Sequence, residues 1–156
     1  RNKQELLTEL CSIDLRALAG AFQKAAKIED PVERLRRVGE AYVAFALEHP
    51  MQYQLLFMTR RPDGGIDPDL TRGDPTQDAY AFLLRTCTEA VKSGRLRPEY
   101  SDPEEVAQIA WSSLHGLIAL HIVKHDDGLV NWRDPAKTAS HMGTALIRGM
   151  LRKPKD

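Results

Sequence analysis

Two histidines four residues apart, His121 and His125, could bind a metal ion, because such a pair shares one face of a helix. A zinc site needs a third and usually a fourth ligand, and neither an HExxH motif nor a cysteine cluster supplies one. A solvated helix end explains the pair better. The sequence therefore predicts no metal and no cofactor.

Nucleophilic catalysis is the second possible chemistry, with Ser112 or Ser113 as the nucleophile and His115 as the base. Residues this close on one helix rarely form a working dyad, and no GxSxG elbow is present. The chain also has no Gly-rich phosphate loop, because Gly64-Gly65 only indicates a turn. The sequence therefore argues against an enzymatic function, and we assign no catalytic residue.

The stretch AWSSLHGLIALH, residues 110–121, is apolar nearly all the way round yet contains Trp111, His115 and Gly116. A glycine inside a helix costs roughly 1 kcal/mol relative to alanine, and a buried imidazole needs a hydrogen-bond partner. Trp111 and His115 are four apart, so both can line one surface. Gly116 points away from them with Ser113, toward a surface that another backbone can approach closely. One helix is therefore predicted to serve two surfaces.

The composition is that of one ordinary globular domain, with 156 residues, 42% hydrophobic and 28% charged. Twenty-two basic residues balance 22 acidic ones, which argues against DNA binding by this chain itself. Cys11 and Cys87 are interpreted as reduced core thiols, although a disulfide stays open. The longest apolar run, 106–123, contains a glutamine, two serines and two histidines. A buried helix in a cytoplasmic protein explains this run better than a membrane span.

Helix starts are marked by Asp-Pro pairs, in which the aspartate caps the helix and the proline takes its first position. The aspartates are Asp30, Asp74, Asp102 and Asp134, and Glu33, Gln77 and Glu105 complete three capping boxes. No segment alternates long enough to predict a strand. The sequence predicts an all-α bundle of about six helices, at about 3–27, 31–48, 51–59, 75–93, 103–123 and 135–151.

The polar segment Arg60–Asp74 is predicted to be the most mobile loop of the chain. It is not a domain boundary, because neither flank has a core of its own. Residue 1 is not a methionine and already stands at the threshold of a helix. We therefore expect a fragment, or the ordered part of a longer protein.

Apolar and aromatic side chains converge from separate helices, which is compatible with a filled core or with a ligand cavity. Trp and His on one face of the central helix favour a cavity, enclosed by the first, second, fourth and fifth helices. Asp14 is interpreted as a polar contact in this cavity or as a paired or exposed carboxylate. The predicted ligand-binding residues are Asp14, Leu18, Phe22, Tyr42, Phe45, Phe57, Phe82, Trp111, Leu114, His115 and Ile118, with Phe57 closing one end.

A twofold homodimer is predicted from the last two long helices. The helix at 103–123 is apolar on too many faces to be covered by one subunit, and small residues on both helices permit close approach. The predicted interface residues are Ile109, Ser113, Gly116, Leu120, Ala139, Gly143, Leu146 and Met150.

Three segments together resemble the TetR family of transcriptional regulators. RNKQELL resembles the junction between the helix-turn-helix domain and the effector-binding domain of that family. YVAFALEHPMQYQLLF resembles its fifth-to-sixth helix segment, with a break at His-Pro. VKSGRLRPE followed by DPEEVAQIAWSSLHGLIAL is similar to the Trp-x-x-x-His-Gly subclass of its C-terminal domains, named for Trp111, His115 and Gly116.

The resemblance implies that residues 1–156 are a ligand-sensing, dimerising domain of a transcriptional regulator, most simply a repressor, that takes a small hydrophobic or aromatic effector. DNA would be bound only through an N-terminal domain absent from this chain, and Lys3 alone matches a position near the DNA backbone. Two alternatives stay open: a dimerisation scaffold with a filled core, and a small helical enzyme.

Overall fold

The computed structural model describes residues 3–59 and 73–153, with side chains from residue 9 onward. Within these ranges the chain is all-α, as predicted, and two short 3₁₀ turns accompany six α-helices. The elements are α1 (Lys3–Gln23), η1 (Lys24–Lys27), α2 (Pro31–Glu48), α3 (Pro50–Phe57), α4 (Ala79–Lys92), η2 (Pro98–Tyr100), α5 (Pro103–Lys124) and α6 (Pro135–Met150). Leu96 and Leu151 form an isolated bridge, and no strand occurs in the described ranges.

Three of the four Asp-Pro helix starts are confirmed. The carboxylates of Asp30, Asp102 and Asp134 accept hydrogen bonds from backbone amides of the first turns of α2, α5 and α6. Proline occupies the first helical position in each, where its missing N–H costs nothing. Glu33 was predicted to complete a capping box with Asp30. Its carboxylate accepts hydrogen bonds from the side chains of Arg36 and Arg37.

The predicted start of the fourth helix at residue 75 is wrong. Asp78 caps α4, accepting from the amides of Tyr80 and Ala81 at 2.9 and 3.1 Å. Asp74 instead accepts from the amide and hydroxyl of Thr76. An aspartate that bonds two residues ahead forms a local turn in competition with a helix. Asp74-Pro75 therefore opens a turn, which the Gln23 amide holds by donating to the Pro75 carbonyl at 2.6 Å.

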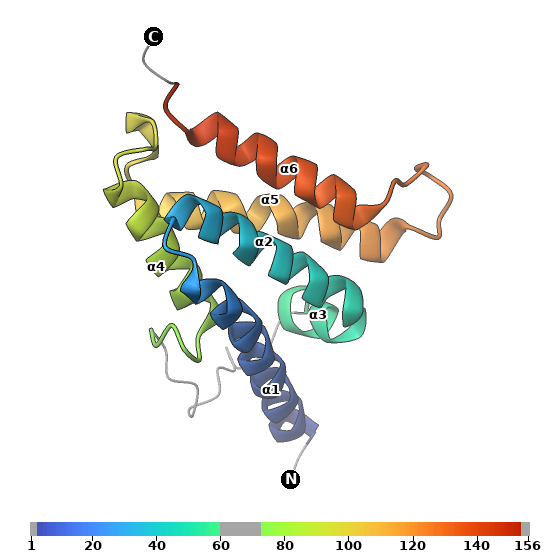
Figure 1. Cartoon of the computed structure of the whole chain (residues 1–156). Coiled ribbons are helices and arrows are strands. Elements are labelled where there is room, and N and C mark those ends of the chain that lie inside the picture. Colours follow the sequence, from blue (N-terminus) through green and yellow to red (C-terminus); the bar gives the residue numbers. More distant parts are fainter. Residues whose placement is uncertain (1–2, 60–72, 154–156) are drawn as a thin grey trace.

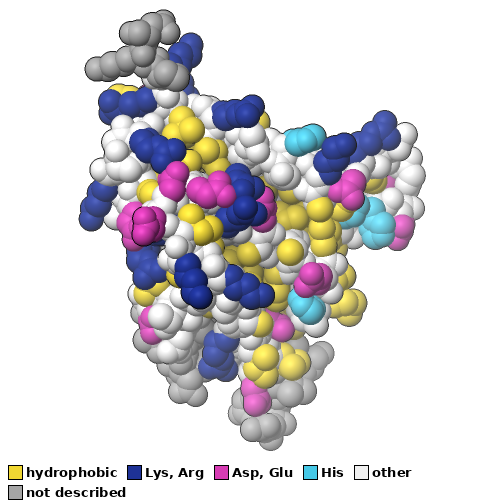
Figure 2. Space-filling view, viewed as in Figure 1, with side chains coloured by type: hydrophobic (Ala, Val, Ile, Leu, Met, Phe, Trp, Pro, Cys, Tyr) yellow, Lys and Arg dark blue, Asp and Glu magenta, His cyan; other side chains and the backbone are white. Residues whose placement is uncertain are grey.

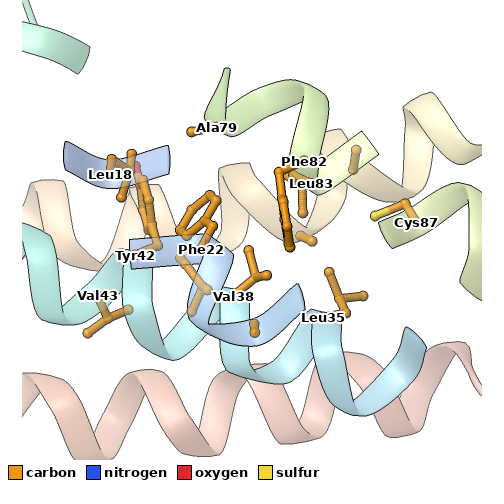
Figure 3. Packing of buried hydrophobic residues seen from close by; sticks show 14 of the residues in the cluster. Leu18, Phe22, Leu35, Val38, Tyr42, Val43, Ala79, Phe82, Leu83 and Cys87 are labelled. Atoms are coloured by element: carbon orange, nitrogen blue, oxygen red, sulfur yellow. The ribbon is translucent and has the colours of Figure 1, made fainter. Parts of the chain in front are cut away.

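Helix α2 lies at the centre of the bundle and packs against α1, α4, α5 and α6 (Figure 1). Figure 3 shows its core side chains, among them Leu35, Val38 and Tyr42, facing Phe22 of α1 and Phe82 of α4. Gly39 of α2 permits a close approach by α5, because a Cβ there would lie 2.9 Å from Leu114 Cδ1. Every other helix is therefore positioned relative to α2.

Helix α5 is buried on one side only. Its Val106, Ala107 and Ile118 are fully buried in the core, whereas Leu120 and Val123 are 57% and 54% exposed. It is also the one described helix long and apolar enough, by length and composition, to cross a membrane, which by itself is weak evidence for a span. The prediction of a buried helix is thus correct for one of its faces.

Candidate functional site

A cavity of about 570 Å³ adjoins α2 and reaches the surface between helices. This volume falls in the usual range for small-molecule sites, about 300–1,000 Å³. Most of its wall is apolar. Six of the residues predicted to bind a ligand line it: Leu18, Phe22, Tyr42, Phe57, Trp111 and Leu114.

Five predicted ligand-binding residues lie outside this lining. Phe82 and Ile118 are fully buried between helices, so they form the core behind the cavity. The Phe45 ring packs on His49, with centroids 5.3 Å apart, and His115 sits against Tyr53. Asp14 is half-buried on α1, where burial raises its pKa and the charge of His49 opposes that shift.

A hydrogen-bonded network joins the polar tips of four side chains. The indole Nε1 of Trp111 donates to the Tyr42 hydroxyl at 3.0 Å. The Tyr42 hydroxyl lies 2.7 Å from the Tyr53 hydroxyl. His115 Nδ1 lies 2.6 Å from the Tyr53 hydroxyl and 3.2 Å from the Tyr42 hydroxyl. The network therefore ties α2, α3 and α5 together at one end of the cavity.

Counting donors fixes the direction of these bonds. If His115 Nδ1 accepts, Trp111 donates to Tyr42, Tyr42 donates to Tyr53 and Tyr53 donates to His115, so both hydroxyls and the indole find an acceptor. If Nδ1 carried a hydrogen, the bonds would reverse and the Tyr42 hydrogen would have no acceptor within the network. A buried donor without an acceptor costs about 1–3 kcal/mol. Both hydroxyls and the indole are therefore paired within the network only when His115 is the Nε2–H tautomer.

The network is electrically neutral near neutral pH. Burial raises the pKa of Tyr42 to about 12 and also raises that of Tyr53, because desolvation penalises a phenolate. Burial lowers the pKa of His115 from its ordinary value of 6.5, because desolvation penalises an imidazolium. The polar tips thus satisfy one another and add no charge to this end of the cavity.

Aromatic rings enclose the network. Phe57 of α3 is the centre of this group, with ring centroids 5.2 Å from Tyr53, 5.8 Å from Tyr42 and 5.9 Å from Trp111. The ring of Tyr80 of α4 also contacts Trp111, with centroids 5.9 Å apart. Tyr53, 0% exposed, belongs to this network but was not among the residues predicted to bind a ligand. The feature of the sequence that could have indicated this position is the spacing of Tyr53 to Phe57, which lies one helical turn later.

Helix α6, which the sequence analysis assigned to a subunit interface, lines the cavity. Ala139, Gly143, Leu146 and Met150, all predicted at the dimer interface, line the cavity opposite α2. Ala139 and Met150 are only 3% and 2% exposed within one chain, so they offer no surface to a partner. The interface prediction is corrected at these two positions, because α6 turns its apolar face inward.

The predicted interface residues of α5 lie on a different surface. Ile109, Ser113 and Gly116 are half-buried and Leu120 is exposed. A Cβ built on Gly116 would meet no atom within 4 Å. No contact among the described residues therefore explains the glycine.

The histidines considered as metal ligands and the serines considered as nucleophiles make local contacts on and near α5. His121 and His125 stack with ring centroids 5.4 Å apart, and His125 Nε2 lies 3.0 Å from Asp126. No group of three or more metal-binding side chains occurs among the described residues. The hydroxyls of Ser112 and Ser113 both donate to the Ile109 carbonyl. The predicted loop at 60–74 lies outside the described residues except for Gly73 and Asp74.

Comparison with known proteins identifies similar domains. Residues 35–146 match the family model described as tetracyclin repressor-like, C-terminal domain. A protein of unknown function from Rhodococcus sp. RHA1 superposes with a TM-score of 0.78 at 22% identity, over 97% of this chain and 76% of the other. The "putative regulatory protein SCO4313" superposes with a TM-score of 0.67 at 25% identity, over 93% of this chain and 73% of the other. No match is found among curated protein sequences.

Removing the Tyr53 hydroxyl should destabilise the fold. Tyr53→Phe takes the nearer donor from His115 Nδ1 and the acceptor from Tyr42, so we expect the free energy of unfolding to fall by about 1–3 kcal/mol. Tyr80→Phe is the control, because that hydroxyl bonds to the exposed Glu104, and should cost less than about 0.5 kcal/mol. Urea denaturation at neutral pH measures both. Equal effects of the two substitutions would contradict the network.

Proposed function

The chain belongs to the tetracyclin repressor-like C-terminal domain family, and we propose that it is the ligand-sensing, dimerising part of a transcriptional regulator of the Trp-x-x-x-His-Gly subclass. The effector is a small, mainly apolar molecule. Regulation is by repression in the cytoplasm, and DNA is bound by an N-terminal domain outside residues 1–156. The chain itself performs no catalysis.

The cavity is the observation that carries this proposal. A filled scaffold would pack the space between α1, α2, α4 and α5 densely, because protein interiors normally hold few voids larger than a water molecule. Here the cavity lined by residues of α1, α2, α4, α5 and α6 has a volume of about 570 Å³. Its wall is made largely of Leu18, Phe22, Leu83 and other apolar side chains, which favours an apolar occupant.

The exposed face of α5 supports dimerisation. Leu120 and Val123 expose apolar surface, and Gly116 has open space around it. A second α5 packed across this face would cover that surface and use the glycine for close approach. Because α5 also carries Trp111 at the cavity, an effector would favour one spacing of the paired subunits over another.

Ligand binding is tested by thermal stability against a library of apolar compounds. A compound present at about a hundred times its dissociation constant should stabilise the wild-type fold by roughly 2.7 kcal/mol. Trp111→Ala should remove this effect, because Trp111 lines the cavity and donates to Tyr42. Trp132→Ala is the matched control, since the other tryptophan bonds to the Lys124 carbonyl outside the cavity. If no compound stabilises the wild type, the scaffold interpretation replaces this one.

Dimerisation is tested by substituting two helical glycines that both have open space in the single chain, Gly116 and Gly20. Gly116→Leu should weaken the dimer by overpacking, at a cost of typically 1–3 kcal/mol. Gly20→Leu, on exposed α1 surface, should leave the association unchanged. Light scattering after size-exclusion chromatography measures the mass. A wild-type monomer at micromolar concentration would refute the proposal.

A further inference from the structure

Four rings that line the cavity also contact one another, and together they form a surface that we call the aromatic wall. They are Tyr42 of α2, Phe57 of α3, Tyr80 of α4 and Trp111 of α5. The Phe57 ring lies 5.8 Å from that of Tyr42 and 5.9 Å from that of Trp111, and the Trp111 and Tyr80 rings are 5.9 Å apart, between centroids. These contacts make the four rings neighbours in the lining, although they come from four helices.

Trp111 has the largest exposed fraction of the four side chains. It is 37% exposed, whereas Tyr42 is 4% exposed and the other two are half-buried. Its ring neighbours Phe57, Tyr80 and His115 meet it at interplanar angles of 74°, 54° and 60°. Offset parallel stacking is a favourable arrangement of two aromatic rings. No aromatic side chain among the described residues takes that position on Trp111, so a ligand ring can.

The polar atoms of the aromatic wall already have partners. The Trp111 indole donates to the Tyr42 hydroxyl, which also bonds to the Tyr53 hydroxyl. The Tyr80 hydroxyl donates to the Glu104 carboxylate at 2.7 Å. A ligand that touches this wall therefore meets ring surface rather than free hydrogen-bond donors.

The charged side chains of the cavity lining are bonded as well. Arg36 and Glu40 bond to each other, and Asp78 accepts from the amides of Tyr80 and Ala81 at the start of α4. Figure 2 shows hydrophobic side chains exposed between α2 and α6, next to a cluster of basic and acidic ones. A charged ligand would compete with these bonds, whereas an uncharged one leaves them intact.

We infer that the effector is a flat, uncharged aromatic molecule that stacks on the Trp111 indole. This rests on the proposed ligand-sensing function and narrows its apolar effector to one with an aromatic ring system. Aromatic pairs attract beyond the burial of their surface area, so the aromatic wall prefers a ring to a saturated group of the same skeleton. Because Trp111 also donates to Tyr42, the ligand contacts a member of the hydrogen-bonded network directly.

The probes are pairs of uncharged alcohols that share one skeleton, one member aromatic and the other saturated. Benzyl alcohol is compared with cyclohexylmethanol, and naphthylmethanol with decahydronaphthylmethanol, with affinity for the full chain measured by calorimetry. The saturated member has no less apolar surface, so apolar burial alone does not favour the aromatic one. Stacking on one ring should make the aromatic member bind about two- to twelvefold more tightly.

Two substitutions separate the Trp111 ring from its hydrogen bond. Trp111→Phe and Trp111→Leu both lose the bond to Tyr42, but only Trp111→Phe keeps an aromatic face. Trp111→Phe should therefore retain the preference for the aromatic member, and Trp111→Leu should lose it. Trp132→Leu is the control, because Trp132 is outside the cavity lining and bonds to Lys124. An equal preference in the two Trp111 variants would overturn the inference.

The indole N–H signals of the two tryptophans show where the ligand binds. In nitrogen–proton correlation spectra, the ring current of bound naphthylmethanol should shift the Trp111 signal more than the Trp132 signal. The spectrum of Trp132→Leu assigns the two signals, because one of them is missing from it. An unshifted Trp111 signal at saturation would contradict stacking.

The remaining outcomes distinguish this inference from the function on which it rests. If the saturated members bind the wild type as tightly as the aromatic ones, the inference is wrong while the cavity remains a ligand site. If no probe binds, other apolar compounds that stabilise the fold decide the question. Saturated compounds alone would overturn the inference, and aromatic ones support it only if their effect survives in Trp111→Phe and not in Trp111→Leu. If no apolar compound of any kind binds, the ligand-sensing function is wrong as well.

Discussion

Burying polar side chains without leaving a hydrogen-bond donor or acceptor unpaired is the constraint on which this domain depends. Tyr42 and Tyr53 are 4% and 0% exposed, and each hydroxyl would cost stability if it lacked a partner. The solution is a closed set, in which Trp111 donates to Tyr42 and the two tyrosines reach His115. Because these residues come from α2, α3 and α5, the bonds fix how three helices meet.

The same constraint explains the chemistry of the cavity. A ligand that replaced one of these bonds would have to restore it, so the network favours occupants that make few polar contacts at that end. Neutral tyrosines and a neutral imidazole also place no charge there. Of the charged residues of the wall, Arg36 and Glu40 bond to each other, and Asp78 caps α4. This arrangement of polar groups is the physical reason why the proposed ligand is apolar.

Local signals predicted the fold well where one residue decides the structure. Asp30, Asp102 and Asp134 cap helices as their Asp-Pro pairs indicate. The same pair at Asp74 fails, because Thr76 offers its own amide and hydroxyl and Asp78 supplies a competing cap four residues later. Sequence alone does not decide between two caps this close, since tertiary contacts such as that of Gln23 with Pro75 contribute.

The candidate site was predictable only in part. Periodicity places Tyr42 toward the interior and Trp111 on the same helical face as His115. Both line the cavity, Trp111 with 37% of its surface exposed. Tyr53 was omitted because the eight residues of α3 have no clear apolar face, so their rotation about the helix axis is fixed by packing. The apolar face of α6 could equally meet α2 or a second subunit, and its periodicity is the same in both cases. Only the fold shows that Ala139 and Met150 turn toward α2.

The tautomer of His115 tests the central claim most directly. Nitrogen chemical shifts and couplings of the imidazole, measured at neutral pH, distinguish a bare Nδ1 from a protonated one. The closed network predicts a neutral ring with a bare Nδ1 that accepts from Tyr53 and a hydrogen on Nε2. A hydrogen on Nδ1, or an imidazolium at neutral pH, would leave the Tyr42 hydroxyl without an acceptor in the network and would contradict the account.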